Sequence, residues 1–404
     1  MLDRARRVIP TGVWGHNRFP AFLGPGRYPV FARRAQGAHF EDVDGRHYID
    51  YMCGYGAMIT GFANPAVDAA ATARMAMGDC LNQPTETSVL LAERLTELIP
   101  DMAWAGFGKN GSDAVSTAFL IARAHTGRTK IVCVNGAYHG SHSWCNWCNI
   151  GAGRPAEDSS MVLPVDWNDL AGMRELFEAE GDSIAAVLMT PFHHPFAAPA
   201  ELPDEAWWPG VSALCRDGEA LLLVDDVRAG FRLDLAGSHR YFGFSPDLIC
   251  LSKALANTHP LSVVLGVDRC REAAEKVFAA GTFWSASAPM AAALANLDLL
   301  CEPGRFDRMQ RLAGQLCDGL VAHGAAVGLT LEITGPPTIP TVTIAGDHDF
   351  ALMTAFAENM VARGSFVHPT HNWFFSAAHD EDDVAATLTH AQGALETAAG
   401  TTTR

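Results

Sequence analysis

Short apolar runs alternate with helix-length segments through the middle of the chain, from about Trp104 to Val267. The runs are apolar on both faces, which is typical of strands that helices cover on each side of a sheet. Because strands alternate with helices, the pattern predicts a parallel sheet, and ligands of such sheets bind at the carboxyl ends of the strands. The expected strands are residues 131–134, 185–189, 220–224, 248–251 and 262–267.

The pattern changes after Pro303, where a helical periodicity begins. Near the other end, a turn at Asp44-Gly45 predicts a hairpin that follows a Gly- and Pro-rich arm. The elements expected after Pro303 are a helix over 305–325, strands near 329–334 and 341–345, and helices near 350–363 and 380–397. We therefore expect an α/β protein in three segments: an arm with part of a small domain (1–55), a large domain (56–302) and a small α+β domain (303–404).

Composition narrows the class of protein. The 404 residues are 49% hydrophobic and 18% charged, which suits one large core and a smaller one. A formal charge of -16 argues against nucleic acid, whose binding proteins gather lysine and arginine on one face. No signal peptide or bilayer-length apolar run is evident, and the ten cysteines are expected to be reduced thiols. We expect a soluble, cytoplasmic protein with no membrane partner.

Two of the expected strands end in ionisable side chains. The strand that ends at Val224 runs into Asp225 and Asp226, and the strand that ends at Leu251 delivers Lys253 to the same edge of the sheet. A lysine in that place is partly desolvated, which lowers its pKa and leaves a free amine that can form an imine. Taken alone, Asp225 is explained equally well as a helix cap or a turn acid.

A Gly/Ser turn at Gly111 and Ser112 opens an apolar-periodic helix, and the free N–H groups at such a helix start can hold a phosphate. An ordinary N-cap explains the turn by itself. The three elements together fit one ligand. A phosphate seat, an aldehyde-trapping lysine and a carboxylate for a pyridinium nitrogen are what pyridoxal phosphate (PLP) requires.

With these motifs the sequence resembles the class III, fold-type I PLP aminotransferases, and most closely the glutamate-1-semialdehyde aminomutase branch. The resemblance covers nearly the whole chain, through ordered matches at residues 4–13, 35–51, 84–86, 122–131, 136–140, 221–232, 245–254, 281–282 and 380–384. It implies a mostly parallel central sheet flanked by helices, with residues 56–302 binding PLP. It also implies a smaller α+β domain formed by both ends of the chain, and a homodimer with a shared active site.

The resemblance also assigns roles to single positions. It makes Lys253 the catalytic lysine that forms an imine with PLP, and Asp225 the acid that keeps the pyridine nitrogen protonated. The other cofactor-binding positions that it implies are Gly111 and Ser112 at the phosphate, Tyr138 and Val227 on the two faces of the ring, His139 beside Tyr138, and Thr282 from the neighbouring subunit.

Three segments depart from the family pattern. Residues 190–195 read Thr-Pro-Phe-His-His-Pro where the family has Glu-Pro and later an asparagine that contacts the ring hydroxyl, so His193 or His194 is expected to take over that contact. Residues 257–259 read Asn-Thr-His in place of a glycine run, and Tyr55 stands where the aminomutase has tryptophan. These changes predict a different substrate.

Two arginines are candidates for binding a substrate carboxylate. Arg18 matches an arginine that has this role in the aminomutase, although an exposed residue of the arm explains it equally well. Arg228 is the second candidate. A metal site is the rival interpretation, because His139, His142, Cys145 and Cys148 are spaced at intervals of three. Aromatic and thiol packing is the simpler explanation of that segment.

The expected activity is aminotransfer between an amine donor and an aldehyde or ketone, with Lys253 moving the proton and with ping-pong kinetics. The same carbanion can instead lead to epimerisation, aminomutation or elimination, and a PLP-binding regulator is the non-enzymatic alternative. Aromatic and histidine side chains suggest a hydroxylated substrate, such as an amino sugar or aminoglycoside precursor of antibiotic biosynthesis. These residues are Trp144, Trp147, His193, His194 and His259.

Overall fold

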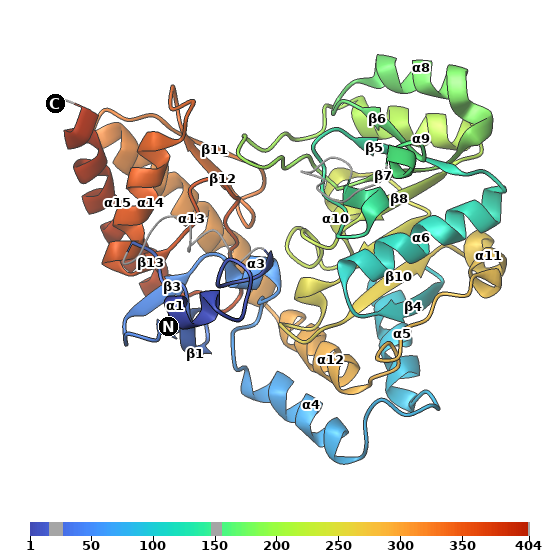
Figure 1. Cartoon of the computed structure of the whole chain (residues 1–404), viewed down its shortest axis with the longest axis horizontal. Coiled ribbons are helices and arrows are strands. Elements are labelled where there is room, and N and C mark those ends of the chain that lie inside the picture. The colour runs from blue at the N-terminus through green and yellow to red at the C-terminus, as the bar shows by residue number, and fades with distance from the viewer. Residues whose placement is uncertain (16–26, 147–155, 403–404) are drawn as a thin grey trace. The chain divides into compact units, whose positions relative to one another are not determined.

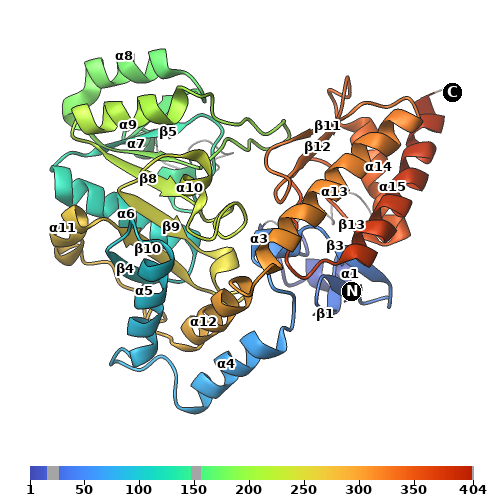
Figure 2. The ribbon, with the colours of Figure 1, turned by 180° about the vertical axis from the view of Figure 1, so that it is seen from behind.

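The computed structural model describes residues 1–15, 27–146 and 156–402 (Figure 1). The chain divides into two compact units. One unit combines Met1–Asn64 with Glu302–Arg404, and the other is the continuous stretch Pro65–Cys301. Each unit is described by itself, and Figure 2 gives the reverse view of both. No helix among the described residues combines the length and the apolar character that a membrane span requires.

The unit Pro65–Cys301 is built on a seven-stranded sheet with the order β4-β10-β9-β8-β7-β5-β6. All residues of the strands β7, β8, β9 and β10 are buried, as expected where helices cover both faces of a sheet. The strands are β4 Trp104–Gly108, β5 Lys130–Val134, β6 Val162–Val165, β7 Ile184–Met189, β8 Leu221–Asp225, β9 Leu248–Leu251 and β10 Ser262–Gly266.

Five neighbouring strands, from β9 to β6, run parallel. The strand β10 breaks this pattern and pairs antiparallel with both β9 and β4. The reason lies in the connection, because parallel neighbours need a crossover of a dozen or more residues, usually a helix. Residues 252–261, between β9 and β10, hold only the short 3-10 turn Lys253–Leu255. The sheet is therefore mostly parallel, and its reversal lies at Lys253.

Helices cover the two faces of this sheet (Figures 1 and 2). On one face α6 and α11 pack on side chains such as Cys133, Leu223 and Cys250. On the other face α8 and α9 pack on the alternate residues, including Val132 and Val224. The helices of this unit are α4 Pro65–Ala76, α5 Glu86–Leu98, α6 Gly111–Thr126, α7 Ala156–Ser159, α8 Leu170–Glu180, α9 Trp207–Asp217, α10 Ser238–Phe242, α11 Arg271–Lys276 and α12 Ala288–Leu300.

The unit formed by the two ends of the chain has α+β architecture. Its four-stranded sheet has the order β1-β2-β3-β13, and β11 pairs separately with β12. The hairpin expected at Asp44-Gly45 is present, with β2 and β3 antiparallel and Gly45 at φ 84°. Its elements are α1 Leu2–Arg6, β1 Ala32–Gln36, β2 His39–Asp42, β3 His47–Asp50, α3 Cys53–Gly56, α13 Arg305–Ala326, β11 Leu331–Thr334, β12 Thr341–Ile344, α14 Ala351–Arg363, β13 Ser365–Phe366 and α15 Glu381–Thr402.

Candidate active site

Most of the candidate cofactor residues lie directly beyond strand ends at one edge of the seven-stranded sheet. The register pairs Met189 with Val224 and Asp225 with Cys250, so β7, β8 and β9 end side by side. The strand β5 runs parallel to β7, and β4 points the same way because β10 is antiparallel to both β4 and β9. The segments that emerge at this edge carry Gly111 and Ser112 after β4, Tyr138 and His139 after β5, His193 and His194 after β7, Asp225 and Arg228 from β8, and Lys253 after β9.

The carboxylate of Asp225 is buried and held in place by hydrogen bonds. The residue is 5% exposed, and its Oδ2 accepts from Nδ1 of His139 at 2.9 Å while its Oδ1 accepts from the N–H of Val227 at 3.2 Å. Asp226 has a different environment, because its side chain accepts from the N–H and the hydroxyl of Ser238. Burial raises the pKa of Asp226 to about 7. Asp226 therefore anchors the following loop, and Asp225 is the acid at the edge of the sheet.

Lys253 begins the 3-10 turn that follows β9, with its backbone in the left-handed region at φ 48°. Burial of the amine lowers its pKa to about 7, and the positive charge of Arg228 lowers the pKa further while Asp225 opposes the change. An exposed lysine has a pKa near 10.4. With a pKa of about 7, Lys253 is a neutral, nucleophilic amine in about half of the molecules at pH 7.

The two histidines after β7 are held in their neutral form. Burial, reinforced by the nearby His139, lowers the pKa of His193 to about 4, and its ring stacks on Trp167 with centroids 5.9 Å apart. Burial also lowers the pKa of His194 well below its usual range, with further contributions from the charges of Arg228 and Lys253. His194 thus shares its surroundings with the lysine. A neutral imidazole has one donor nitrogen and one acceptor nitrogen, and it carries no net charge that would favour an anionic partner.

The start of α6 packs tightly against two loops of the same edge. A Cβ placed on Gly111 would lie 3.0 Å from Cγ1 of Val227. Gly140 adopts φ 130°, and a Cβ there would lie 2.5 Å from Oγ of Ser112. The capping box between Asn110 and Asp113 uses the N–H of Asp113, so within the described residues the N–H groups of Gly111 and Ser112 remain for an anion. The start of α6 and the loops that carry Val227 and Gly140 are therefore packed closely together.

Comparison with known proteins identifies the family. A family model for class III aminotransferases matches residues 24–149 and 155–374. The chain is 42% identical to the aminopentol aminotransferase of Sphingopyxis macrogoltabida over 388 residues, which is 96% of this chain and 91% of that protein. The chain belongs to the class III aminotransferase family. It is a PLP-dependent aminotransferase with the fold-type I architecture, so the resemblance in the sequence is confirmed.

Two further relatives of this aminotransferase support the family assignment, one by its named activity and one by its fold. The 3-aminobutyryl-CoA aminotransferase of Cloacimonas acidaminovorans is 31% identical over 397 residues, which is 96% of this chain and 94% of that protein. The FumI protein of Sphingopyxis sp. MTA144, solved in its PLP internal aldimine form, superposes with a TM-score of 0.94 at 40% identity. That match covers 98% of this chain and 95% of the FumI chain.

The residues at the sheet edge fit PLP in their donor set. Nε2 of His139 is buried and has no hydrogen-bond partner among the described residues, although its ring is fixed by the bond to Asp225. The glycines at 111 and 140 let the loops approach one another closely, because a Cβ there would collide with Val227 or Ser112. An acid, a lysine with a lowered pKa and a helix start at one edge match the ring nitrogen, the aldehyde and the phosphate of the cofactor.

Five expected residues are not joined to this cluster by the described structure. Thr282 is exposed, and the thiol of Cys80 donates to its carbonyl at 3.2 Å. Tyr55 belongs to the other unit, where it lies edge-on to His371. Arg18, Trp147 and Cys148 lie outside the described residues. The described part of the chain holds no group of three or more potential metal ligands, and the family assignment accounts for Tyr138-His139-Gly140 without a metal.

Sequence reasoning missed three residues that support the cluster. Ser141 donates its N–H to Oγ of Ser112 at 2.9 Å, and Ser252 donates its hydroxyl to the carbonyl of Leu261 at 2.7 Å. Asn296 is fully buried in α12 and reaches the turn of Lys253. A signal for Asn296 was present, because it is a lone amide in the apolar run of residues 288–297.

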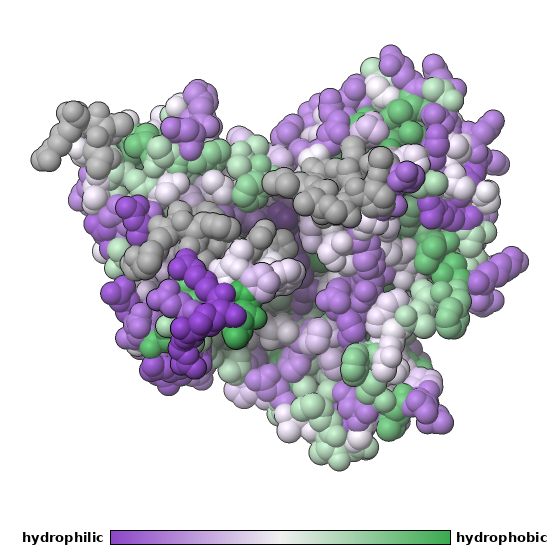
Figure 3. Space-filling model, viewed as in Figure 1, coloured by the Kyte–Doolittle hydropathy of each residue, from purple (hydrophilic) through white to green (hydrophobic). Residues whose placement is uncertain are grey.

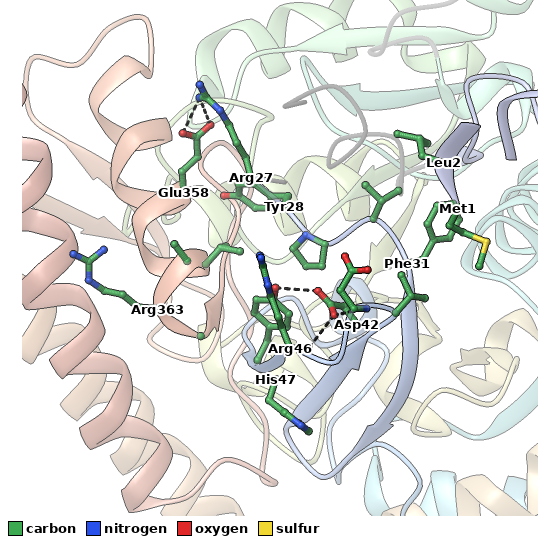
Figure 4. Close-up of a pocket in the computed structure, with 18 of the residues that line it drawn as sticks. Met1, Leu2, Arg27, Tyr28, Phe31, Asp42, Arg46, His47, Glu358 and Arg363 are labelled. Atoms are coloured by element: carbon green, nitrogen blue, oxygen red, sulfur yellow. Dashed lines mark hydrogen bonds and ion pairs between the residues drawn. The ribbon is translucent and has the colours of Figure 1, made fainter. Parts of the chain in front are cut away.

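A separate cavity of about 900 Å³ lies within the unit formed by the two ends of the chain (Figure 4). Its charged side chains largely satisfy one another. Arg27 donates to both oxygens of Glu358 at 2.9 Å, and Asp42 accepts from the hydroxyl of Tyr48 at 3.1 Å. Arg363 donates to backbone carbonyls of its own unit. The cavity holds neither an acid–lysine pair nor a phosphate seat, so the candidate active site is the sheet edge.

Proposed function

We propose that this aminotransferase takes its amino group from a primary amine on a hydroxylated carbon skeleton and passes it to an aldehyde or ketone. The observation that carries the proposal is the grouping of a lysine with a lowered pKa, a buried acid and two neutral histidines at one sheet edge. The relative that is 42% identical is named for aminopentol, an amine with several hydroxyl groups. An amino sugar or aminoglycoside precursor belongs to the same chemical class.

PLP supplies the electron sink that lets a proton leave the carbon bearing the amine. The chain supplies the rest. Asp225, fixed by His139, would place a negative charge at the ring nitrogen, and the start of α6 at Gly111 and Ser112 would hold the phosphate. Val227 and Tyr138 would pack on the ring. Lys253 receives the proton at Nζ and returns it to a different carbon, as a general base and then a general acid.

The polar groups around the amine support a hydroxylated donor. His193 and His194 are neutral at pH 7, so they pair with hydroxyl groups better than with a carboxylate. The same histidines are available to the ring hydroxyl of the cofactor. Arg228, whose pKa burial lowers to about 10, stays cationic and is the candidate partner for a carboxylate on the carbonyl substrate. Arg18 and Tyr55 remain proposed substrate residues.

Replacement of Lys253 tests the proposed chemistry. Lys253→Ala should remove the visible absorbance of lysine-bound PLP and lower the turnover number by roughly four orders of magnitude, because both the imine and the proton carrier are lost. Lys276→Ala is the matched control, since Lys276 is an exposed lysine paired with Glu272. A Lys253→Ala protein that stays coloured and fully active would contradict the proposal.

The substrate class is tested separately, by incubating the wild-type enzyme with hydroxylated amines and with α-amino acids and analysing the products by mass. Polyhydroxylated amines should be converted to carbonyl compounds faster than amino acids, with the cofactor accumulating as its pyridoxamine form. Solvent deuterium entering the substrate without that form would instead indicate epimerisation, and loss of water would indicate elimination. Either result would contradict aminotransfer for that substrate.

We also propose a homodimer in which Thr282 binds the PLP phosphate of the partner subunit. Hydrogen bonds tie residues 80 and 81 to residues 282 and 285, and several large apolar side chains of this region are exposed. Figure 3 shows hydrophobic residues among polar ones at the surface over α4. A gathering of exposed large apolar side chains commonly marks an interface. The exposed large apolar side chains of α4 and of the segments near it and Thr282 are Met75 at 54%, Met77 at 76%, Leu81 at 44%, Phe278 at 94% and Phe283 at 66%.

Mixed dimers distinguish a shared site from a private one. In a Lys253→Ala/Thr282→Ala hybrid, a shared arrangement leaves one site with both Lys253 and the partner's Thr282. The hybrid should then regain about half of the wild-type activity at limiting PLP, well above either parent, because its subunits complete one site between them. A hybrid no more active than its parents would show that Thr282 serves its own subunit.

Two further proposals concern the chain as a whole. We propose that Pro65–Cys301 is the PLP-binding domain and that the two ends of the chain form the small domain. We also propose that the enzyme works in the cytoplasm. The cysteines whose side chains are described are free thiols, which suits a reducing compartment. Cell fractionation with antibody detection would test the location.

A further inference from the structure

The turn that carries Lys253 has an unusual backbone. Lys253, Asn257 and Thr258 adopt φ values of 48°, 43° and 78°, in the left-handed region that favours glycine. A β-branched residue such as Thr258 is a genuine outlier there. Strained conformations of this kind persist only where the surrounding structure enforces them, and they cluster at functional sites. Contacts from the surrounding structure must therefore hold this turn in place.

Asn296 provides such a contact. Its Nδ2 donates to the carbonyl of Ala254 at 2.8 Å and to the carbonyl of Leu255 at 3.1 Å. Both of these residues are 0% exposed, so solvent does not offer an alternative donor. A buried carbonyl without a partner is strongly unfavourable. The amide thus holds the two peptide units that directly follow Lys253.

Asn296 reaches the turn from a well-fixed helix. It lies in α12 with 0% exposure, among alanine and leucine side chains. At the start of that helix, Oδ1 of Asp79 accepts from the N–H of Ser287 at 2.5 Å and of Ala288 at 3.2 Å. An asparagine amide carries two N–H donors, whereas leucine has none and an aspartate carboxylate only accepts. The residue type therefore matches the two carbonyls.

We propose that Asn296 is a positioning residue for aminotransfer, which fixes the backbone of Lys253 and so the direction from which the amine approaches PLP and the substrate. This proposal rests on the role proposed for Lys253. Asn296 does not itself touch the reacting atoms. Its effect should appear in the behaviour of the lysine rather than only in the stability of the fold.

The test compares Asn296→Leu and Asn296→Asp with Leu300→Ala, all as holoenzymes. Leu300 is also fully buried on α12 and serves as the control for lost stability. The visible absorbance of lysine-bound PLP, titrated against pH, should show the pKa of the linkage raised by about half a unit or more in both Asn296 variants, because the nitrogen moves away from the cation of Arg228. The first half-reaction should slow about ten-fold or more at equal PLP content.

Leu300→Ala should lower the melting temperature but change neither the pKa of the linkage nor the rate of the first half-reaction. Asn296→Gln keeps both donors, so its pKa and rate should lie between those of the wild type and Asn296→Leu. If Asn296→Leu loses only thermal stability, as the control does, the positioning role is wrong. If Asn296→Leu does not fold, Asn296→Asp and Asn296→Gln carry the same comparison. Failure of the Lys253 role would appear separately, as a coloured and active Lys253→Ala enzyme.

Discussion

The ends of β8 and β9 lie side by side and are held in opposite ways. At the end of β8 the hydrogen bonds go to the functional group itself, because the carboxylate of Asp225 accepts from His139 and from the N–H of Val227. At the end of β9 they go to the backbone, where Asn296 and Ser252 bind carbonyls on the loop that carries Lys253. Asp225 is therefore fixed at its carboxylate, whereas Lys253 is fixed through the backbone of its loop.

The difference follows from what each group has to do. An acid that stabilises a positive ring nitrogen must keep its charge in one place, and a preorganised carboxylate does so without reorganising during the reaction. A lysine that carries a proton between two carbons has to move, so it needs a fixed starting point and a free side chain. The left-handed φ of 48° at Lys253 is a strained backbone conformation that accompanies this fixed position.

Removing the negative charge of Asp225, at the end of β8, should have the largest effect on turnover. Asp225→Asn keeps the shape of the side chain but loses the negative charge, and turnover should fall roughly 10²–10³-fold, the range seen when one electrostatic contact to a reacting group is removed. Steady-state kinetics at saturating PLP measures this loss. Asp225→Glu is the control that restores the charge, and it should recover part of the activity. Equal turnover in the wild type and Asp225→Asn would show that the negative charge of Asp225 does not contribute to the reaction.

The two strand ends also differ in how far the sequence predicts them. Asp225 and Lys253 were found because ionisable residues at the ends of apolar strands are rare, and the strands themselves are recognisable from their apolar runs. The reversal of β10 was not predicted. It depends on the absence of a crossover helix in residues 252–261, and a run such as residues 262–267 looks the same in either direction.

Contacts across long sequence separations were also out of reach. His139 reaches Asp225 from the loop after β5, and Asn296 reaches the Lys253 turn from α12. In neither case does spacing along the chain reveal the partner. The proximity of His194 to Lys253 is of the same kind, because it arises only once β7 and β9 occupy the same sheet. Local pattern predicts which groups emerge at strand ends, and strand order decides which of them meet.

Removing the positive charge of Arg228, beside Lys253, should have an intermediate effect. Arg228 lowers the pKa of Lys253, which lies at about 7. Arg228→Met removes that cation, so the pKa of Lys253 should rise by about one unit. The apoenzyme amine reacts only in its neutral form, which prevails above the pKa, so its reaction with added PLP should require a higher pH than in the wild type.

The rate of PLP uptake by the apoenzyme, followed by absorbance between pH 6 and 10, gives the midpoint directly. Arg228→Lys keeps a positive charge at this position and should leave the midpoint near that of the wild type. A midpoint in Arg228→Met that stays at pH 7 or falls would show that the charge of Arg228 does not act on the lysine. The Michaelis constant for the carbonyl substrate, measured on the same variants, tests the proposed carboxylate contact.

The smallest effect is expected from the other backbone contact of the Lys253 loop. Ser252→Ala removes a buried hydrogen bond of 2.7 Å to the carbonyl of Leu261, which should lower the free energy of unfolding by about 1 kcal/mol. Urea denaturation followed by fluorescence measures the change. Ser88→Ala, which removes a local bond to Thr85 at the start of α5, is the control and should cost less. Because Asn296 still holds Ala254 and Leu255, turnover in Ser252→Ala should stay within about two-fold of the wild type. A loss of turnover as large as that of Asp225→Asn would mean that the lysine loop is held by Ser252 and not by Asn296.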